Sequence, residues 1–259
     1  MSIPKCKNKF SSQSLVEPER YYQYLRDQGM IKEQKIPMAV VMCFSPAMVE
    51  YAKSKYTLSK KDGFNIGELY SINETNERVG LFLCHGVGAP GAAINLEEMI
   101  VSGVQRIFIV GSAGSLQGRV NPGDLVLCEG ALRDEGTSHH YVLEGDFSTP
   151  SAALMQKMTT YLDNQNIPHH KGLTWTIDTP YRETKEEVLT YQKMGVLTVE
   201  MEASACFSVA QFRNKEIGAI FVISDTMADL HWQPKFFSQE VANGLHRSFD
   251  AVVGLLASL

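Results

Sequence analysis

The chain lacks an apolar run of membrane-spanning length and lacks an excess of positive charge. Its 24 lysine and arginine residues are outnumbered by 29 aspartate and glutamate residues, which gives a formal net charge of −5. This balance disfavours a nucleic acid or an anionic membrane as partner. The first thirty residues are polar and lack the apolar core of a signal peptide. We therefore expect a cytoplasmic protein.

Cysteine is scarce, and no two cysteines have the spacing of a paired motif. The five cysteines form no CxxC motif, and Cys43, Cys84 and Cys128 sit in apolar runs, so they are interpreted as reduced and buried. The chain also lacks the Gly-x-Ser-x-Gly pattern of acyl-transfer enzymes. His139 and His140 are adjacent in a polar segment, where neighbouring side chains point in opposite directions, and we expect no metal site.

Short, uniformly apolar segments alternate with helical patterns along most of the chain. Such segments are typical of strands buried on both faces by helices. The strands expected lie at 37–44, 79–84, 106–110, 125–128, 171–177, 196–199 and 217–223, and the longer helices at 14–28, 151–166, 185–193, 203–212 and 238–258. We expect residues 36–259 to form a single α/β domain, with a central mixed, mostly parallel sheet flanked by helices, and residues 1–35 to form an N-terminal extension.

Polar or glycine-rich residues follow several of these strands. Ligands of α/β sheets bind at the carboxyl ends of strands, so these positions are the candidate site. The stretch around Glu200, Met201 and Glu202 places two carboxylates directly after an apolar run. A buried carboxylate needs a partner, and a sugar diol would supply two hydroxyl donors. The start of a helix, where glutamate is favoured, explains the same residues equally well.

Two other strand ends carry residues that could bind or protonate a ligand. Gly111 and Ser112 offer backbone N–H groups and a hydroxyl that suit phosphate oxygens, although a plain turn has a similar sequence. Asp225 closes the last apolar strand. It could protonate a heterocycle nitrogen if burial raised its pKa, or it could cap a helix.

In combination these motifs resemble the nucleoside phosphorylase superfamily, of the uridine phosphorylase and hexameric purine nucleoside phosphorylase type. The methylthioadenosine and adenosylhomocysteine nucleosidases are a related hydrolytic branch. The matching segments occur in the family's order, at His85–Pro90, Gly111–Gln117, Pro122–Val126, Val199–Ala203 and Ile223–Asp225.

The resemblance implies cleavage of a nucleoside N-glycosidic bond without a cofactor, with inorganic phosphate as co-substrate. It implies that Glu202 binds the ribose hydroxyls, that Met201 packs on the sugar and that Glu200 lines the pocket. Gly111 and Ser112 would bind phosphate. It also implies a homo-oligomer, either a dimer or a hexamer built as a trimer of dimers.

The identity of the base stays open at this point. In the purine enzymes of the family, the residue that matches Asp225 is the general acid, and this favours a purine. The segment with Asp178, Tyr181 and Arg182 resembles instead the base-recognition segment of uridine phosphorylases. Arg182 could donate to a carbonyl oxygen of either base. We therefore favour a purine nucleoside and keep uridine as the alternative.

The chain departs from the family where phosphate binds. Met48 and Ile109 stand where the family has two phosphate-binding arginines. The family's hexamers take a third arginine from a neighbouring subunit, and the nearest basic candidates for it here are Lys60 and Lys61. Losing charge-assisted contacts weakens phosphate binding. Phosphorolysis to free base and ribose 1-phosphate remains the first expectation. Hydrolysis, with Glu50 as the nearest carboxylate to activate water, and nucleoside binding without catalysis are the alternatives.

Overall fold

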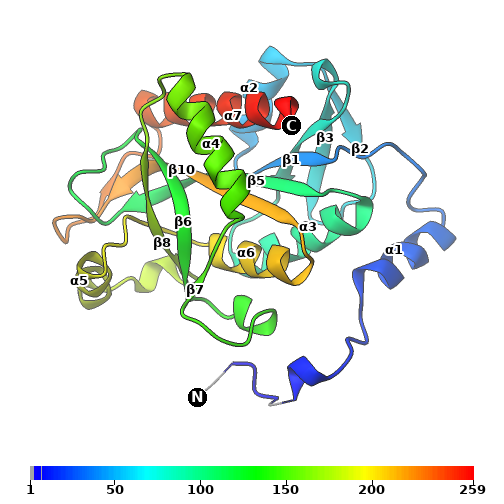
Figure 1. The fold of residues 1–259 in the computed structure, drawn as a ribbon, viewed down its shortest axis with the longest axis horizontal. Helices are drawn as coiled ribbons and strands as arrows, with labels where there is room; N and C mark the ends of the chain where they lie inside the picture. Colours follow the sequence, from blue (N-terminus) through cyan, green and yellow to red (C-terminus); the bar gives the residue numbers. More distant parts are fainter. Residues whose placement is uncertain (1–2, 7) are drawn as a thin grey trace.

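The computed structural model describes residues 3–6 and 8–259 and shows an α/β fold (Figure 1). Its helices are α1 (Pro18–Asp27), α2 (Pro46–Lys55), α3 (Ala89–Ser102), α4 (Ala152–Asn164), α5 (Lys185–Lys193), α6 (Ala203–Phe212) and α7 (Gln239–Ser258), with short 3-10 turns η1 (Lys9–Ser11), η2 (Asn73–Thr75), η3 (Ser138–His140) and η4 (Pro180–Arg182). Its strands are β1 (Ala39–Cys43), β2 (Leu58–Lys61), β3 (Gly67–Ile72), β4 (Val79–Cys84), β5 (Arg106–Ser115), β6 (Leu125–Asp134), β7 (Phe147–Ser148), β8 (His170–Ile177), β9 (Thr198–Glu200), β10 (Glu216–Thr226) and β11 (Gln233–Pro234).

The strands form one mixed sheet that closes partly on itself. Its order is β11-β10-β6-β8-β9-β5-β1-β4-β3-β2, and β10 also pairs with β5. Strands β10, β6, β8, β9 and β5 therefore make a ring, from which β1, β4, β3 and β2 extend. The pairs β1–β4, β1–β5 and β5–β10 are parallel, as are β6–β8 and β8–β9, whereas β2, β3, β7 and β11 pair in antiparallel fashion.

Helices cover the sheet on both sides, which explains the uniformly apolar strands. Every residue of β1 and β4 is buried. Helices α2, α4 and α7 lie on one side of the sheet, and α3 and α6 lie on the other (Figure 1). Each side of the sheet has its own apolar core. Apolar side chains on both faces of a central strand are therefore buried, and this burial stabilises the fold.

The structure differs from the sequence-based expectation at β5, which reaches the cavity, and at β6, which does not. β5 does not end at Val110 but continues through Gly111 and Ser112 to Ser115, and β6 continues from Cys128 to Asp134. The apolar pattern stops early because the last residues of β5 border a cavity. Their strand conformation is kept by pairing with β10, in which Phe221 lies opposite Gly111 and Val222 opposite Ser112.

The N-terminal helix packs on the body of the domain. The buried residues of α1 are Tyr22 and Leu25, and the Tyr22 hydroxyl donates to the carbonyl of Gly63 at 2.8 Å. Arg213 of the α6 C-terminus lies 3.8 Å from Glu19. Across residues 3–6 and 8–259, no helix is both long enough and apolar enough to span a bilayer.

Candidate functional site

A cavity of about 500 Å³ lies where β1, β5, β9 and β10 end. Aromatic, small and acidic residues line it: Phe44, Val87, Gly111, Ser112, Ala113, Gly114, Pro180, Tyr181, Glu183, Val199, Glu200, Met201, Glu202, Phe221, Ser224, Asp225, Met227, Trp232 and Phe236. The cavity therefore gathers the strand ends that the sequence singled out and places four carboxyl groups around one space.

Glu200 ends β9 and holds the start of α6. Its carboxylate accepts hydrogen bonds from the Thr176 hydroxyl at 2.5 Å and from the backbone N–H groups of Glu202 and Ala203 at 2.8 and 2.7 Å. It is only 6% exposed. Of the two glutamates in this stretch, Glu200 is therefore the one that stabilises the start of a helix. Its hydrogen bonds also fix the backbone of Glu202.

Glu202 is left more open toward the cavity. It accepts a hydrogen bond from the backbone N–H of Gly88 at 2.5 Å. Gly88 can present this N–H because its φ of +103° is in the region that favours glycine. Burial raises the pKa of Glu202, and burial followed by the charge on Glu202 raises the pKa of Glu200. A ligand with hydroxyl donors would satisfy the open acceptor positions of Glu202.

Asp225 lies inside β10, so the helix-cap interpretation of this residue is wrong. It is 7% exposed and accepts two hydrogen bonds, from the Ser224 hydroxyl at 2.8 Å and from the Trp232 indole N–H at 2.9 Å. A Cβ at Gly114 would lie 3.0 Å from Asp225 Oδ2, so the opposite strand leaves room for this carboxylate by carrying glycine. The side chain is thereby fixed at the cavity wall.

The predicted base-binding segment reaches the cavity only in part. Tyr181 lines the opening with a fully exposed side chain, whereas Asp178 and Arg182 are not among the lining residues. Asp178 instead accepts a hydrogen bond from the backbone N–H of Gly136 at 2.9 Å. The structure therefore does not bring Asp178 and Arg182 to the site with Tyr181.

Glu183 and Trp232 are among the lining residues that were missed from the sequence. Glu183 follows the predicted base-binding segment directly, but a glutamate just before a helix looks like an ordinary helix-start residue. Burial, and then the charges on Asp225 and Glu187, raise the pKa of Glu183 to about 7. Trp232 is on the loop after β10, and only the β10–β11 pairing of Asp225 with Pro234 brings this loop back over the cavity. No local sequence signal marks that return.

The predicted phosphate residues Gly111 and Ser112 line the cavity beside Phe44 and Phe221. Met48 and Ile109 are buried in the two apolar cores and do not line it. No lysine, arginine or histidine lines the cavity in the described ranges 3–6 and 8–259. This wall thus offers a hydroxyl, backbone N–H groups and aromatic rings, but no cation.

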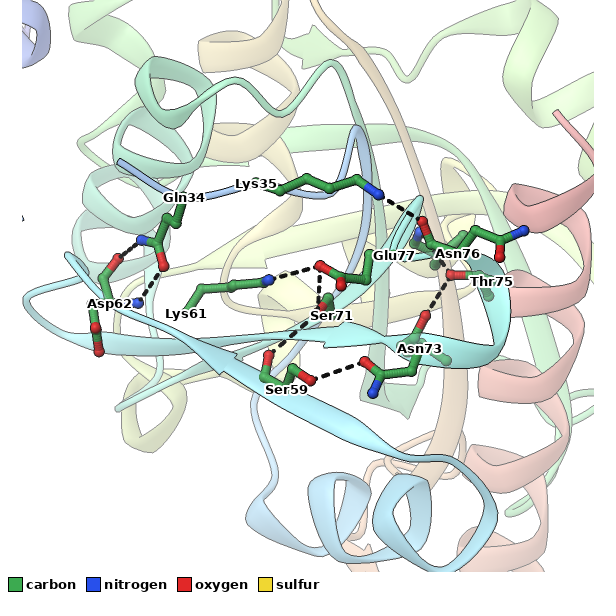
Figure 2. Close-up of polar contacts among 12 residues, drawn as sticks. Gln34, Lys35, Ser59, Lys61, Asp62, Ser71, Asn73, Thr75, Asn76 and Glu77 are labelled. Carbon is green, nitrogen blue, oxygen red and sulfur yellow. Dashed lines mark hydrogen bonds and ion pairs between the residues drawn. The ribbon is translucent and has the colours of Figure 1, made fainter. Parts of the chain in front are cut away.

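Lys60 and Lys61, the basic candidates for a contact with a neighbouring subunit's site, form ion pairs within this chain. Lys61 pairs with Glu77 at 2.8 Å within the polar contacts of the β2–β3 edge, which Figure 2 shows. Lys60 pairs with Glu68, also at 2.8 Å. Glu50 is exposed, pairs with Lys53 and does not line the cavity. The residues that the structure describes contain no cluster of three or more His, Cys, Asp or Glu side chains suited to a metal ion.

Residues 39–254 match the family model of the Phosphorylase superfamily, and the chain belongs to this superfamily. A guanosine phosphorylase of Halorubrum lacusprofundi is 29% identical over 157 residues, which are 60% of this chain and 65% of that protein. A purine nucleoside phosphorylase of Plasmodium falciparum is 27% identical over 205 residues, which are 77% of this chain and 82% of that protein. The match to the first thus spans less than two thirds of its length.

Solved structures confirm the predicted fold. A purine nucleoside phosphorylase from Toxoplasma gondii, in complex with immucillin-H, superposes with a TM-score of 0.77 at 18% identity, covering 86% of this chain and 91% of that one. A uridine phosphorylase from Vibrio fischeri superposes with a TM-score of 0.71 at 24% identity, covering 88% and 94%. The resemblance drawn from the motifs is therefore confirmed at the level of family and fold.

Proposed function

We propose that this protein cleaves the N-glycosidic bond of a nucleoside, with a purine favoured and uridine as the alternative, by phosphorolysis to free base and ribose 1-phosphate. The observation that carries the proposal is that Glu202 and Asp225, from α6 and β10, line the same cavity. The Glu202 carboxylate is available to a sugar, and the Asp225 carboxyl group is available to a leaving base. Membership of the Phosphorylase superfamily and the phosphorylase relatives support it.

The sugar end of this proposed site is built from Glu202, Met201 and Glu200. The Glu202 carboxylate accepts hydrogen bonds from the ribose hydroxyls, and Met201 packs on the sugar. Glu200 holds the backbone that carries both. The transition state of glycosidic cleavage resembles an oxocarbenium ion, so nearby carboxylates lower its energy.

The base end is built from Asp225, with Tyr181 at the opening. Cleavage leaves negative charge on the base, and a proton delivered through Asp225 to a ring nitrogen neutralises it. Ser224 and Trp232 hold the carboxyl group in place. Roles for Asp178 and Arg182 in base binding require that the η4 segment moves, because neither lines the cavity.

Inorganic phosphate is the proposed acceptor, and no cofactor is invoked. The Ser112 hydroxyl and the backbone N–H groups near Gly111 would bind it while it attacks the anomeric carbon. With no cation in the described lining, we expect this binding to be weak. The same observation favours a second candidate, in which water takes the place of phosphate and the products are base and free ribose. Nucleoside binding without catalysis is a third.

Product analysis separates these candidates. The purified protein is incubated with guanosine, inosine, adenosine and uridine, with and without inorganic phosphate, and the sugar product is identified by ³¹P NMR for ribose 1-phosphate and by ¹H NMR for free ribose. Ribose 1-phosphate supports phosphorolysis, and ribose formed in the absence of phosphate supports hydrolysis. Intact nucleoside in every reaction, with binding retained, would leave only the binding protein.

The proposal also covers the cellular location and the assembly of the protein. The chain would serve nucleotide salvage in the cytoplasm as a homo-oligomer, either a dimer or a trimer of dimers, with residues 1–35 as an extension of the domain at 36–259. Exposed apolar side chains on neighbouring helices, Ile94 on α3 and Phe212 on α6, support an intersubunit contact. A molar mass of one subunit in solution would contradict it.

A further inference from the structure

The residue before helix α6 does not cap that helix. An N-cap residue ordinarily uses its side chain to accept a hydrogen bond from the backbone N–H of the second or third helical residue. Glu202 occupies the N-cap position of α6, but within the described chain its side chain forms no such bond and accepts instead from the backbone N–H of Gly88. The first N–H groups of a helix have no partner inside it, so those of α6 need acceptors from elsewhere.

Thr176 of β8 supplies one of these acceptors. Its hydroxyl oxygen accepts from the backbone N–H of Ser204 at 3.0 Å, and its hydroxyl proton is donated to Glu200 at 2.5 Å. Glu200 in turn accepts from the N–H groups of Glu202 and Ala203 at 2.8 and 2.7 Å. Thr176 lies opposite Glu200 in the parallel pairing of β8 with β9 and is fully buried. A hydroxyl group suits this position because it donates and accepts at the same time.

Glu135 anchors the same turn of α6 through a side chain. It directly follows β6, is buried, and accepts a hydrogen bond from the Ser204 hydroxyl at 2.8 Å. The backbone N–H groups of Thr137 and Ser138 donate to the same carboxylate at 2.5 and 3.0 Å, so this carboxylate is itself fixed. Ser204 is thereby held at two atoms, its backbone nitrogen and its hydroxyl oxygen. The first turn of α6 is therefore held by β8 and by the loop after β6, and not by the N-cap residue.

We propose that Thr176 is a positioning residue for Glu202. By capping α6 in place of the N-cap residue, its hydroxyl leaves the Glu202 carboxylate free to accept hydrogen bonds from the ribose hydroxyls. Thr176 is not among the residues that line the cavity, so it acts through α6 and not through a contact with the substrate. This inference rests on the proposed nucleoside cleavage and adds to it a residue outside the cavity.

The test compares the wild type with Thr176→Val, which keeps nearly the same shape and removes the hydroxyl. Two substrates are used, inosine and 2′,3′-dideoxyinosine, and the second lacks both ribose hydroxyls. A hydrogen bond to a charged group is worth about tenfold or more, so we expect kcat/KM for inosine to fall at least about tenfold, mostly through KM, and that for 2′,3′-dideoxyinosine to change by less than about twofold. Thr176→Ser restores the hydroxyl and should restore most of the activity with inosine.

Thr174→Val is the matched control. Thr174 lies on the same strand, is equally buried, and donates its hydroxyl proton to the backbone carbonyl of Thr198 in β9 at 3.3 Å. Its hydroxyl therefore supports the sheet and not the start of α6. We expect Thr174→Val to leave the ratio of kcat/KM for the two nucleosides unchanged, because a loss caused only by a weakened core affects both substrates alike.

Equal losses with both substrates in Thr176→Val, or no loss with inosine, would overturn the inference. Thermal melting shows whether this variant is folded. If it is not, Thr176→Cys is measured in its place and must show the same difference between the two substrates, since a thiol is a weak donor and acceptor.

If the wild type cleaves no nucleoside, the proposed function fails, and calorimetric binding tests Thr176 separately. Tighter binding of inosine than of 2′,3′-dideoxyinosine by the wild type, with the difference lost in Thr176→Val, would support the positioning role. Any other pattern of binding would overturn it.

Discussion

The indole N–H of Trp232 donates to Oδ2 of Asp225 at 2.9 Å, across the turn that joins β10 to β11. Trp232 is 60% exposed, and its ring lies beside that of Phe236, with 6.1 Å between the ring centroids. Both rings line the cavity. The loop after β10 therefore has two functions in the fold, as a cavity wall and as the support of an acidic side chain.

Replacing Trp232 by phenylalanine keeps an aromatic ring and removes the N–H donor. We expect kcat with a purine nucleoside to fall about tenfold with a smaller change in KM, because a hydrogen bond to a charged group contributes about 1.5–3 kcal/mol. Steady-state kinetics measure this. Phe237→Leu, which changes a fully exposed side chain between β11 and α7, is the matched control. Unchanged kcat in Trp232→Phe would show that the indole does not position Asp225.

Asp225→Asn removes the group proposed to deliver a proton to the leaving base. General acid catalysis typically contributes about 10²–10⁴-fold, and we expect kcat for inosine to fall in this range. A nucleoside with a leaving group that needs no proton, such as a nitrophenyl riboside, should lose far less. Asp163→Asn on α4, outside the cavity, controls for the change in charge. Equal losses with both substrates would contradict the proton-transfer role.

Glu202→Gln tests the ribose contact. A charged hydrogen bond of about 1.5–3 kcal/mol implies a loss of about ten- to a hundredfold in kcat/KM for inosine. If Glu202 binds the sugar hydroxyls, 2′-deoxyinosine and 3′-deoxyinosine lose activity with the wild type but lose little more with the variant. Glu129→Gln, an exposed residue of β6, is the control. Independent, additive losses would argue against a direct contact.

The buried pair Glu200 and Glu202 should make stability depend on pH. Burial raises the pKa of both carboxyl groups in the folded state, so the folded protein binds protons more tightly than the unfolded chain. The contribution is fully present below the unfolded value of glutamate and is lost as pH rises through the raised values toward neutrality. Each group contributes a slope of about 1.4 kcal/mol per pH unit within that window.

Urea unfolding of the wild type and Glu202→Gln from pH 5 to pH 8 measures this effect. The free energy of unfolding of the wild type should fall more steeply with pH than that of the variant, by about the slope of one group. Comparing the two proteins cancels the titrations that they share, except that of Glu200, whose pKa falls when the charge on Glu202 is removed. Parallel curves would show that Glu202 ionises in the folded state as readily as in the unfolded chain.

The sequence predicted the parts of the site that lie at the ends of buried strands. Glu200, Met201, Glu202, Ser112 and Asp225 all line one cavity because β5 pairs with both β9 and β10 close to the positions of these residues. Apolar runs fix which segments are strands, and a sheet brings their ends together regardless of distance along the chain. The family resemblance followed from the same positions.

The other residues of the cavity wall lie on loops, and no periodic pattern in the sequence predicts how a loop folds. Trp232 reaches Asp225 through a two-residue strand pairing, and Glu183 enters the cavity because the capping box of α5 fixes the residue before it. Asp178 was predicted at the base but bonds the backbone of Gly136 instead. The short polar segments that carry these residues have equivalent compositions whether they face a cavity or solvent.

The most direct test of phosphorolysis is the initial rate of base release from guanosine, measured as inorganic phosphate is raised from zero. We expect no release without phosphate, and a hyperbolic rise with half-saturation at high phosphate concentration, since the lining found in the described chain has no cation. A rate that is already maximal without phosphate, or no release at any phosphate concentration, would contradict phosphorolysis by this protein.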